Sequence, residues 1–170
     1  MNIERAITKK FDDCIIALNN YDIDSAYRYL QNAKSYLSNL NKRHILWAYY
    51  YVNLSSIYNN IGNFYASIDY CNKAKKIIKK HKDKRLEAKI ASNMSSAYFN
   101  LSDYNNAQNY VLKAIDIYQK KTQKEALAAE LLSLAQILLR QGKWSQAIKK
   151  CSKALLLAKK NNGNKQVQGK

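Results

Sequence analysis

Proline is absent from the 170-residue sequence, and glycine occurs only four times. A soluble chain of this length usually contains about eight prolines. Because proline interrupts helices, its absence favours long helices over a loop-rich β-sandwich. Four glycines are too few for the phosphate-binding turns of Rossmann and P-loop folds, and neither glycine motif occurs. The length suits a single domain with a sizeable core.

The sequence also lacks a long apolar stretch. The longest unbroken apolar run, Ile45 to Val52, has eight residues, whereas a membrane-spanning helix needs roughly 20. The first residues are charged and contain no apolar segment of the kind found in signal peptides. The three cysteines show no disulfide-framework spacing. We therefore expect no membrane insertion and a cytoplasmic location.

Residue patterns typical of catalysis are missing as well. The two histidines, His44 and His81, are far apart, and no Cys/His spacing suits zinc. No pair of carboxylates is spaced for acid–base work. Cys71 and Cys151 align in an apolar position of the repeat described next, which predicts inert packing thiols. We expect no enzyme activity, no metal site and no cofactor.

An internal repeat is the main feature that the sequence does contain. When the chain is aligned with itself after a shift of 40 residues, positions of the same character coincide. Gly62 and Gly142 share one such column of positions, with Ser102 between them. A fainter copy lies upstream, and there Tyr21 takes the glycine position. A second column holds only small residues, namely Ala74, Ala114 and Ala154.

Each repeat unit has the pattern of two helices joined by a short turn. Leu54, Tyr58 and Ile61 fall at i, i+4 and i+7 on one helix face, and Gly62 then supplies a left-handed end to that helix. A second helix with its own apolar face follows the glycine. We expect eight helices, at about 3–20, 23–40, 43–61, 64–80, 83–101, 104–121, 123–141 and 144–160.

The small and aromatic columns indicate how these helices pack. Alanine at the recurring small position lets paired helices approach closely, and aromatic residues such as Tyr58, Tyr98 and Trp144 are expected to fill the wider gaps. No single hairpin buries its own apolar face, so stacking of hairpins provides the core.

The segment from Asn53 to Ala74 has the pattern N-L-x-x-x-Y-x-x-x-G-x-F/Y-x-x-[AS]-I-x-x-[YC]-x-x-A and resembles the tetratricopeptide repeat (TPR). The resemblance covers three full units and a degenerate first one. The period is 40 residues rather than the usual 34, and the closing proline is absent. This longer period is similar to the extended repeats of bacterial peptide-sensing regulators and of eukaryotic polarity adaptors of the Pins type.

The resemblance implies an all-α fold, a right-handed α-solenoid of four TPR-like helical hairpins. The solenoid would form one domain over residues 1–162, with repeats at about 1–41, 42–81, 82–121 and 122–161. A frayed tail is expected at 163–170.

In this family the first helices of the hairpins line a concave groove that holds extended peptides or partner helices. The resemblance places that groove on polar columns. Side-chain amides offer donors and acceptors to a peptide main chain, and Lys89 and Arg140 offer cations to a carboxylate. The predicted peptide-binding residues are Asn53, Ser56, Asn60, Lys89, Asn93, Ser96, Asn100, Ser133, Gln136 and Arg140.

An alternative interpretation of these polar columns needs no ligand, because an exposed helix face is polar in any case. Asparagine is a poor helix former, however, so its recurrence in one column favours a function. The sequence thus predicts a non-catalytic interaction module, an adaptor or scaffold with a protein or peptide partner.

The distribution of charge suggests a second candidate partner. The chain has 29 Lys and Arg against 12 Asp and Glu, a formal net charge of +17, and no acid follows Glu130. Lysine recurs in two columns, which predicts lysine rows that bind a polyanion such as an acidic protein or nucleic acid. A solvated face and favourable helix-dipole contacts explain the same lysines without a ligand. The predicted anion-binding residues are Lys73, Lys80, Lys113, Lys120, Lys153 and Lys160.

The last predicted helix lacks a polar cap on its outer face. Leu155, Leu156 and Leu157 follow one another there, so at least one leucine is expected to stay exposed. This predicts self-association or partner docking through the C-terminal helix.

Overall fold

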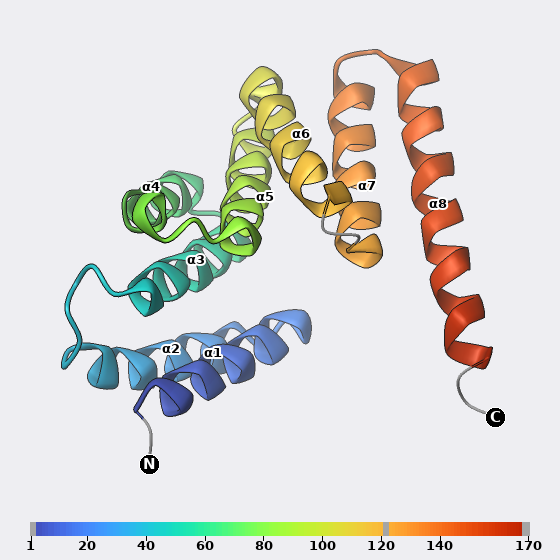
Figure 1. Ribbon diagram of the computed structural model, residues 1–170. Coiled ribbons are helices and arrows are strands. Elements are labelled where there is room, and N and C mark those ends of the chain that lie inside the picture. Colours follow the sequence, from blue (N-terminus) through green and yellow to red (C-terminus); the bar gives the residue numbers. More distant parts are fainter. Residues whose placement is uncertain (1–2, 121–122, 168–170) are drawn as a thin grey trace.

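A computed structural model describes the backbone of residues 3–120 and 123–167 and the side chains of 3–120 and 123–159. Within this part of the chain there are eight helices and no strand, as the sequence predicted (Figure 1). None of these helices is long and apolar enough to cross a membrane. They are α1 (Ile3–Asn19), α2 (Ile23–Leu37), α3 (Ile45–Asn60), α4 (Phe64–His81), α5 (Lys84–Asn100), α6 (Tyr104–Lys120), α7 (Lys124–Arg140) and α8 (Trp144–Val167).

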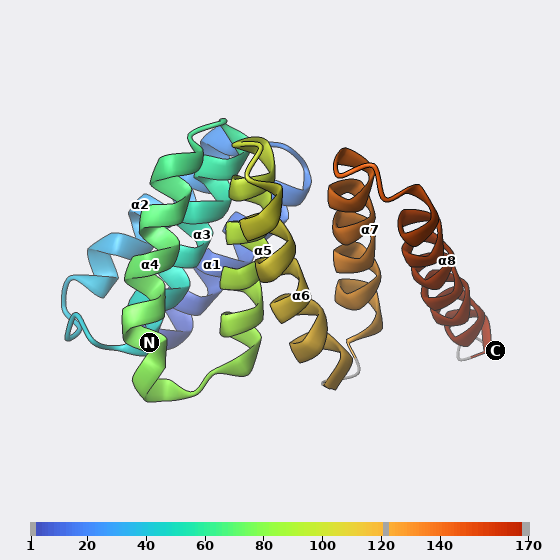
Figure 2. The same cartoon turned by 90° about the horizontal axis from the view of Figure 1, so that it is seen from above.

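Consecutive helices pair into four hairpins that stand in a row. The most extensive packing joins α1 to α2, α3 to α4, α5 to α6 and α7 to α8, and each second helix then packs on the first helix of the next hairpin. Figures 1 and 2 show the α1/α2 hairpin at one end of the row and α8 at the other.

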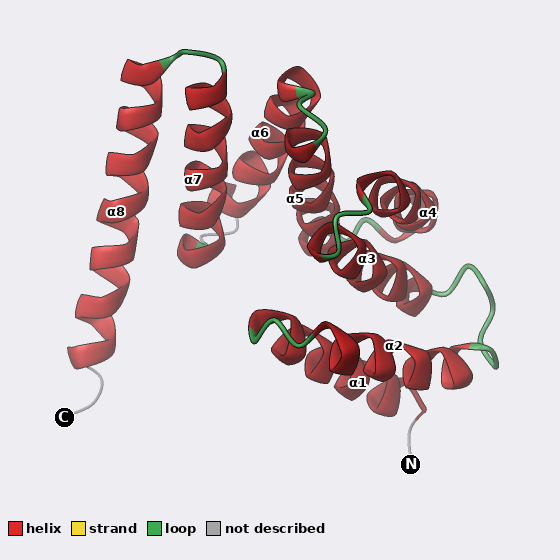
Figure 3. Cartoon of the chain, turned by 180° about the vertical axis from the view of Figure 1, so that it is seen from behind, coloured by secondary structure: helices red, strands yellow, loops and turns green. Residues whose placement is uncertain are grey.

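The two layers of helices differ in their contacts with one another. The first helices touch in sequence, α1 with α3, α3 with α5 and α5 with α7, whereas the second helices make no such contacts within the described residues. The first helices therefore form the inner, concave layer and the second helices the outer, convex layer. The view from behind shows the same row (Figure 3).

The turn inside each hairpin is the same in all four repeats. One residue adopts the left-handed backbone conformation, and the amide of the next residue closes the preceding helix, as in the bond from Asn63 N to Tyr58 O at 2.9 Å. The glycine column of the sequence is thereby explained, and its two non-glycine members adopt the same conformation. The left-handed residues are Tyr21 (φ 59°), Gly62 (φ 78°), Ser102 (φ 61°) and Gly142 (φ 73°).

The core contains the predicted small and aromatic residues. Ala74 and Ala114 are fully buried, and Ala154 is 2% exposed. Two stacked tyrosine pairs link the helices of the middle hairpins and are themselves 40 residues apart. They are Tyr58–Tyr70, with ring centroids 5.2 Å apart, and Tyr98–Tyr110, at 5.6 Å.

The last hairpin departs from the predicted packing. Trp144 was expected to fill a gap between hairpins but is 66% exposed. Cys151 was expected in the core, like its equivalent Cys71, but is exposed. Both predictions were wrong for one physical reason. The first helix of the next hairpin packs on α4 and on α6, whereas no described helix packs on α8 from that side.

Other features of α8 match the sequence more closely. Leu155 and Leu156 are exposed, as expected for at least one of the three leucines, and the partner proposed for this face stays a prediction. The helix continues to Val167, so the expected end at residue 160 was too early. Most of the segment expected to fray thus lies on α8, and residues 168–170 lie outside the described chain. The other helix ends agree with the predicted ones to within three residues.

We predict that Gly62→Ala lowers the free energy of unfolding by about 1 kcal/mol, because an L-residue is strained in the left-handed conformation. An added Cβ would meet no atom within 4 Å, so the cost is conformational alone. Ser102→Gly is expected to raise stability by about 0.5 kcal/mol, since the same strain is relieved there. Urea unfolding followed by circular dichroism measures both changes. Equal stability of Gly62→Ala and wild type would contradict this account of the turn.

A second prediction concerns thiol reactivity. Burial raises the pKa of Cys14 to about 12 and that of Cys71 to about 11, whereas Cys151 is exposed. Because the thiolate is the reactive form, a disulfide reagent at about pH 8 should modify one thiol per chain rapidly. Cys151→Ser should abolish that fast phase. A fast phase of two or three thiols would show that the first two hairpins are not packed as described.

Candidate functional site

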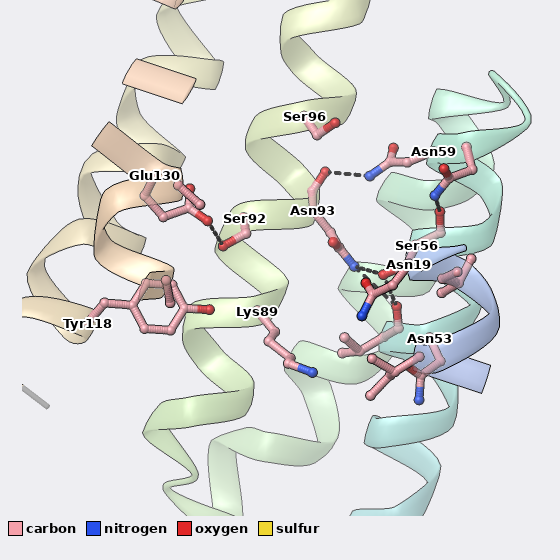
Figure 4. Close-up of a pocket in the computed structure, with 16 residues that line it drawn as sticks. Asn19, Asn53, Ser56, Asn59, Lys89, Ser92, Asn93, Ser96, Tyr118 and Glu130 are labelled. Carbon is pink, nitrogen blue, oxygen red and sulfur yellow. Dashed lines mark hydrogen bonds between the residues drawn. The ribbon is translucent and has the colours of Figure 1, made fainter. Parts of the chain in front are cut away.

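The first helices line a groove along the concave layer. Its central part has a volume of about 570 Å³ and is lined by residues of α1, α3, α5 and α7, with Tyr118 from α6 (Figure 4). A hollow of about 310 Å³ adjoins it among α1, α3 and α5, and shares Asn53 and Lys89 with it. A second hollow of about 380 Å³ adjoins it between α5 and α7, and shares Ser92 and Glu130. The three spaces together are called the groove below.

The structure brings most of the predicted peptide-binding residues to this groove. Arg140 is the exception, because it does not line the groove, and its guanidinium carbon lies 6.0 Å from the centre of the Phe99 ring. Lys89 lies where the central part meets the first hollow. The predicted residues that line the groove are Asn53, Ser56, Asn60, Lys89, Asn93, Ser96, Asn100, Ser133 and Gln136.

Asn93 has a clear structural role within the groove wall. Its Nδ2 lies 2.6 Å from Ser55 Oγ, 2.9 Å from Ser56 Oγ and 3.1 Å from Val52 O, so it donates across the interface to α3. In return, Asn59 Nδ2 donates to Asn93 O at 3.0 Å. An amide nitrogen carries two hydrogens, which these three acceptors share. The donors of Asn93 therefore hold α5 against α3.

Asn60 and Asn100 bond to their own helices. Each Nδ2 donates at 2.9 Å to the carbonyl four residues earlier, that of Ser56 and that of Ser96. These bonds and those of Asn93 explain part of the asparagine recurrence without a ligand. The interpretation that needs no ligand thus accounts for the donors of these three asparagines.

Asn53 differs from the other asparagines of the groove. The residue is only 5% exposed, and its side chain makes no hydrogen bond to another residue of the described chain, yet it lines both the central part and the first hollow. Asn59 Oδ1 is also buried without a partner. Buried polar groups are nearly always hydrogen-bonded, so Asn59 Oδ1 is an exception. The Asn53 amide instead opens onto the groove, where water or a ligand can bond to it.

The groove also holds two half-buried charges of opposite sign. Burial, with the nearby Arg85 adding to it, lowers the pKa of Lys89, and no carboxylate of the described residues lies within 4.0 Å of its ammonium. Burial raises the pKa of Glu130, whose carboxylate accepts a bond from Ser92 Oγ at 2.6 Å. Figure 4 shows Glu130 extending from α7 towards Ser92 on α5.

Several groove residues were not predicted from the sequence. Glu130, Ser92 and Asn59 belong to this group, as do Ile15 and Asn19 from α1. The signal for Glu130 was its position as the last acid of a basic chain. The first repeat is too degenerate for its groove positions to be recognised by alignment with the other repeats.

The lysine rows are already partly neutralised by carboxylates of the chain. Lys80 and Lys153 are exposed and form no ion pair with a described residue, while the side chain of Lys160 lies outside the described residues. The paired lysines are Lys73 with Asp69 at 2.7 Å, Lys113 with Glu87 at 2.9 Å and Lys120 with Asp116 at 2.9 Å. Half of the six predicted anion-binding lysines are therefore paired within the chain.

Metal ligands do not gather anywhere in the described residues, where no group of three or more His, Cys, Asp or Glu side chains is suitably placed to hold an ion. The polar groups of the groove are instead amides, hydroxyls and the charged side chains of Asp12, Arg85, Lys89 and Glu130. Such a lining is suited to binding by hydrogen bonds and charge pairing.

Two family models match the sequence. Residues 44–120 match a tetratricopeptide-repeat model, and residues 94–169 match the model of anaphase-promoting complex subunit 5. Among curated proteins, none matches the chain by sequence. The match shows that residues 44–120 contain tetratricopeptide repeats, and the stacked hairpins give the described chain the fold of such repeats. Stacks of such repeats present extended concave binding surfaces.

Solved structures share this fold at low sequence identity. Aspartyl phosphate phosphatase F from Bacillus subtilis has a TM-score of 0.74 and 21% identity over 92% of this chain and 41% of its own. A signal transduction ATPase with a tetratricopeptide-repeat sensor, from Pyrococcus horikoshii, has a TM-score of 0.76 and 21% identity over 90% of this chain and 23% of its own. The chain thus spans less than half the length of these two proteins.

A kinesin light chain protein with TPR-like repeats, from Podosopora anserina, has a TM-score of 0.70 and 15% identity. That similarity covers 94% of this chain and 78% of the other. At these identities the comparisons with solved structures show a common fold.

We predict that Asn93→Ala lowers the free energy of unfolding by about 1–3 kcal/mol, because it removes the hydrogen bonds that its amide makes to α3 across the interface. Asn100→Ala is the matched control, since Asn100 is exposed and bonds only to its own helix. The control should change stability by less than about 0.5 kcal/mol. Both values come from urea unfolding. Equal destabilisation by the two substitutions would remove the structural role of Asn93.

Proposed function

We propose that the groove binds an extended peptide or a partner helix, and that the chain is a non-catalytic interaction module. The observation that carries this proposal is Asn53, a nearly buried amide that lines the groove and has no hydrogen-bond partner in the described chain. A peptide group offers the matching donor and acceptor to such an amide. The same argument applies to Asn59 Oδ1.

Lys89 adds a charged contact to this site. Its ammonium is half-buried, faces the groove beside Asn53 and has no carboxylate partner within 4.0 Å in the described chain. A carboxylate or a peptide carbonyl of the ligand would restore the interactions that burial removes from the ammonium. Asn53 and Lys89 thus form the anchor of the proposed site, whereas Asn93 supports it from the wall.

The dimensions of the groove suit a peptide. Packed helices lie about 8–10 Å apart, so four first helices span about 25–30 Å. About eight residues of extended chain cover that length. In the Pyrococcus horikoshii protein, the repeats are described as a sensor, which supports a ligand-binding role for the same fold here.

We predict that Asn53→Ala weakens peptide binding about tenfold, because the ligand loses its hydrogen bonds to the buried amide. A library of peptides of about ten residues is first screened against the wild-type chain. The peptide bound most tightly is then titrated against each variant by fluorescence anisotropy. Asn109→Ala, an exposed asparagine of α6, is the matched control and should bind like wild type.

Two results would overturn the proposal. One is a wild-type chain that binds no peptide of the library but is retained on heparin, which would favour the lysine rows. The other is an Asn53→Ala variant with unchanged peptide affinity and unchanged helicity.

A further inference from the structure

Glu130 is unusual among the acids of this chain. Asp69, Asp116 and Glu87 have a lysine within 4.0 Å. Of the acids without one, Asp22 and Asp83 accept hydrogen bonds as helix caps. Glu130 has no basic group of the described residues within that distance, although the chain carries 29 Lys and Arg. Its one described bond is with the hydroxyl of Ser92, at 2.6 Å. Glu130 is therefore a half-buried carboxylate without a cationic partner among the described residues.

Leaving this carboxylate unpaired has a cost for the folded chain. Removal from water disfavours the ionised form, which is the main reason that the pKa of Glu130 is raised. A single hydroxyl donor compensates for only part of the lost hydration. The fold therefore retains a group that destabilises it at neutral pH, and a bound cation would remove that penalty.

The surroundings of Glu130 match the chemistry of a basic side chain. Glu130 lies at the junction of the central groove and the hollow of about 380 Å³ between α5 and α7. The Phe99 ring lines the same hollow, with the hydroxyl of Ser133 and the amide of Gln136. A carboxylate forms charged hydrogen bonds with ammonium or guanidinium groups, and an aromatic face attracts either cation.

Arg140 does not occupy this place. It lies near Phe99, at 6.0 Å from the ring centre, but it does not line the hollow, and its guanidinium is not within 4.0 Å of Glu130. No basic group of the described residues therefore occupies the place beside Glu130.

We propose that Glu130 and the hollow between α5 and α7 form a specificity subsite for a lysine or arginine side chain of the bound peptide. The proposal rests on the proposed function, and it adds the chemical class of one ligand residue. Glu130 accepts the charged hydrogen bond, and Ser92 orients the carboxylate. Together with Lys89 at the other end of the central groove, Glu130 gives the site opposite charge preferences at two places.

The experiment uses arrays of N-acetylated, C-amidated peptides in which each position of a wild-type binder is replaced in turn. The wild-type chain should prefer Arg or Lys over Gln at one position by about tenfold. Glu130→Gln should reduce that preference to about onefold. Asp116→Asn removes the same charge from an exposed ion pair outside the groove and should retain the preference. Separate Arg and Lys peptides show which cation fits better.

Charge reversal provides a second variant. Glu130→Lys should reverse the preference, so that Glu replaces Arg or Lys as the favoured residue at that position. Thermal unfolding then separates binding from folding, since Glu130→Gln should raise Tm by about 2 °C near neutral pH. A lower Tm for Glu130→Gln would assign Glu130 to the structure of the fold and overturn the subsite.

The outcomes distinguish this inference from the proposed function. If the wild-type chain binds no peptide, both fail. If it binds peptides without any preference for a basic residue, or if Glu130→Gln keeps that preference, only the Glu130 subsite is overturned.

Discussion

The stacking of one hairpin on the next is the interaction on which this structure depends. Each second helix presents an apolar column that its own hairpin leaves uncovered, and the first helix of the next hairpin buries it. Cys71 shows this directly, because its thiol donates to Ser55 Oγ and lies 3.8 Å from the carbonyl of Ile90 on the next hairpin. The equivalent Cys151 has no such neighbour and is exposed. Burial here is a property of the interface between repeats.

Stacking also creates the groove and determines which of its polar side chains find hydrogen-bond partners. The first helices touch one another in the inner layer, so some of their polar residues form hydrogen bonds across the interface while others face the groove. Asn93 satisfies the interface through its bonds to α3, while Asn53 and Glu130 remain without a partner of matching chemistry. Residues that stabilise the groove, such as Asn93, thus lie close to residues that are proposed to bind a ligand, such as Asn53.

The sequence was sufficient for the features that recur. The eight helices, the left-handed turn at Gly62 and the buried column of Ala74 all followed from a 40-residue repeat, because each position occurs several times in the same environment. The groove columns followed from family resemblance for the same reason. Trp144 and Cys151 were misplaced because a repeat pattern does not reveal which copy lacks a neighbour.

Features without a recurring counterpart could not be predicted from the repeat. Glu130 occurs once, and its lack of a cation is visible only when the distances to all basic groups are known. The different tasks of Asn53 and Asn93 were hidden in the same way, since the two residues occupy one column of the repeat. Their difference arises from which helix lies next to each amide, and this is a property of three-dimensional packing.

The uneven contacts of the two layers have a geometric consequence. The inner helices touch and the outer helices do not, so each hairpin is turned relative to the next and the row curves around the concave side. The turns at the three interfaces add along the row, and their sum sets the curvature of the whole arc. A substitution that changes the packing angle at one interface would therefore change the shape of the groove.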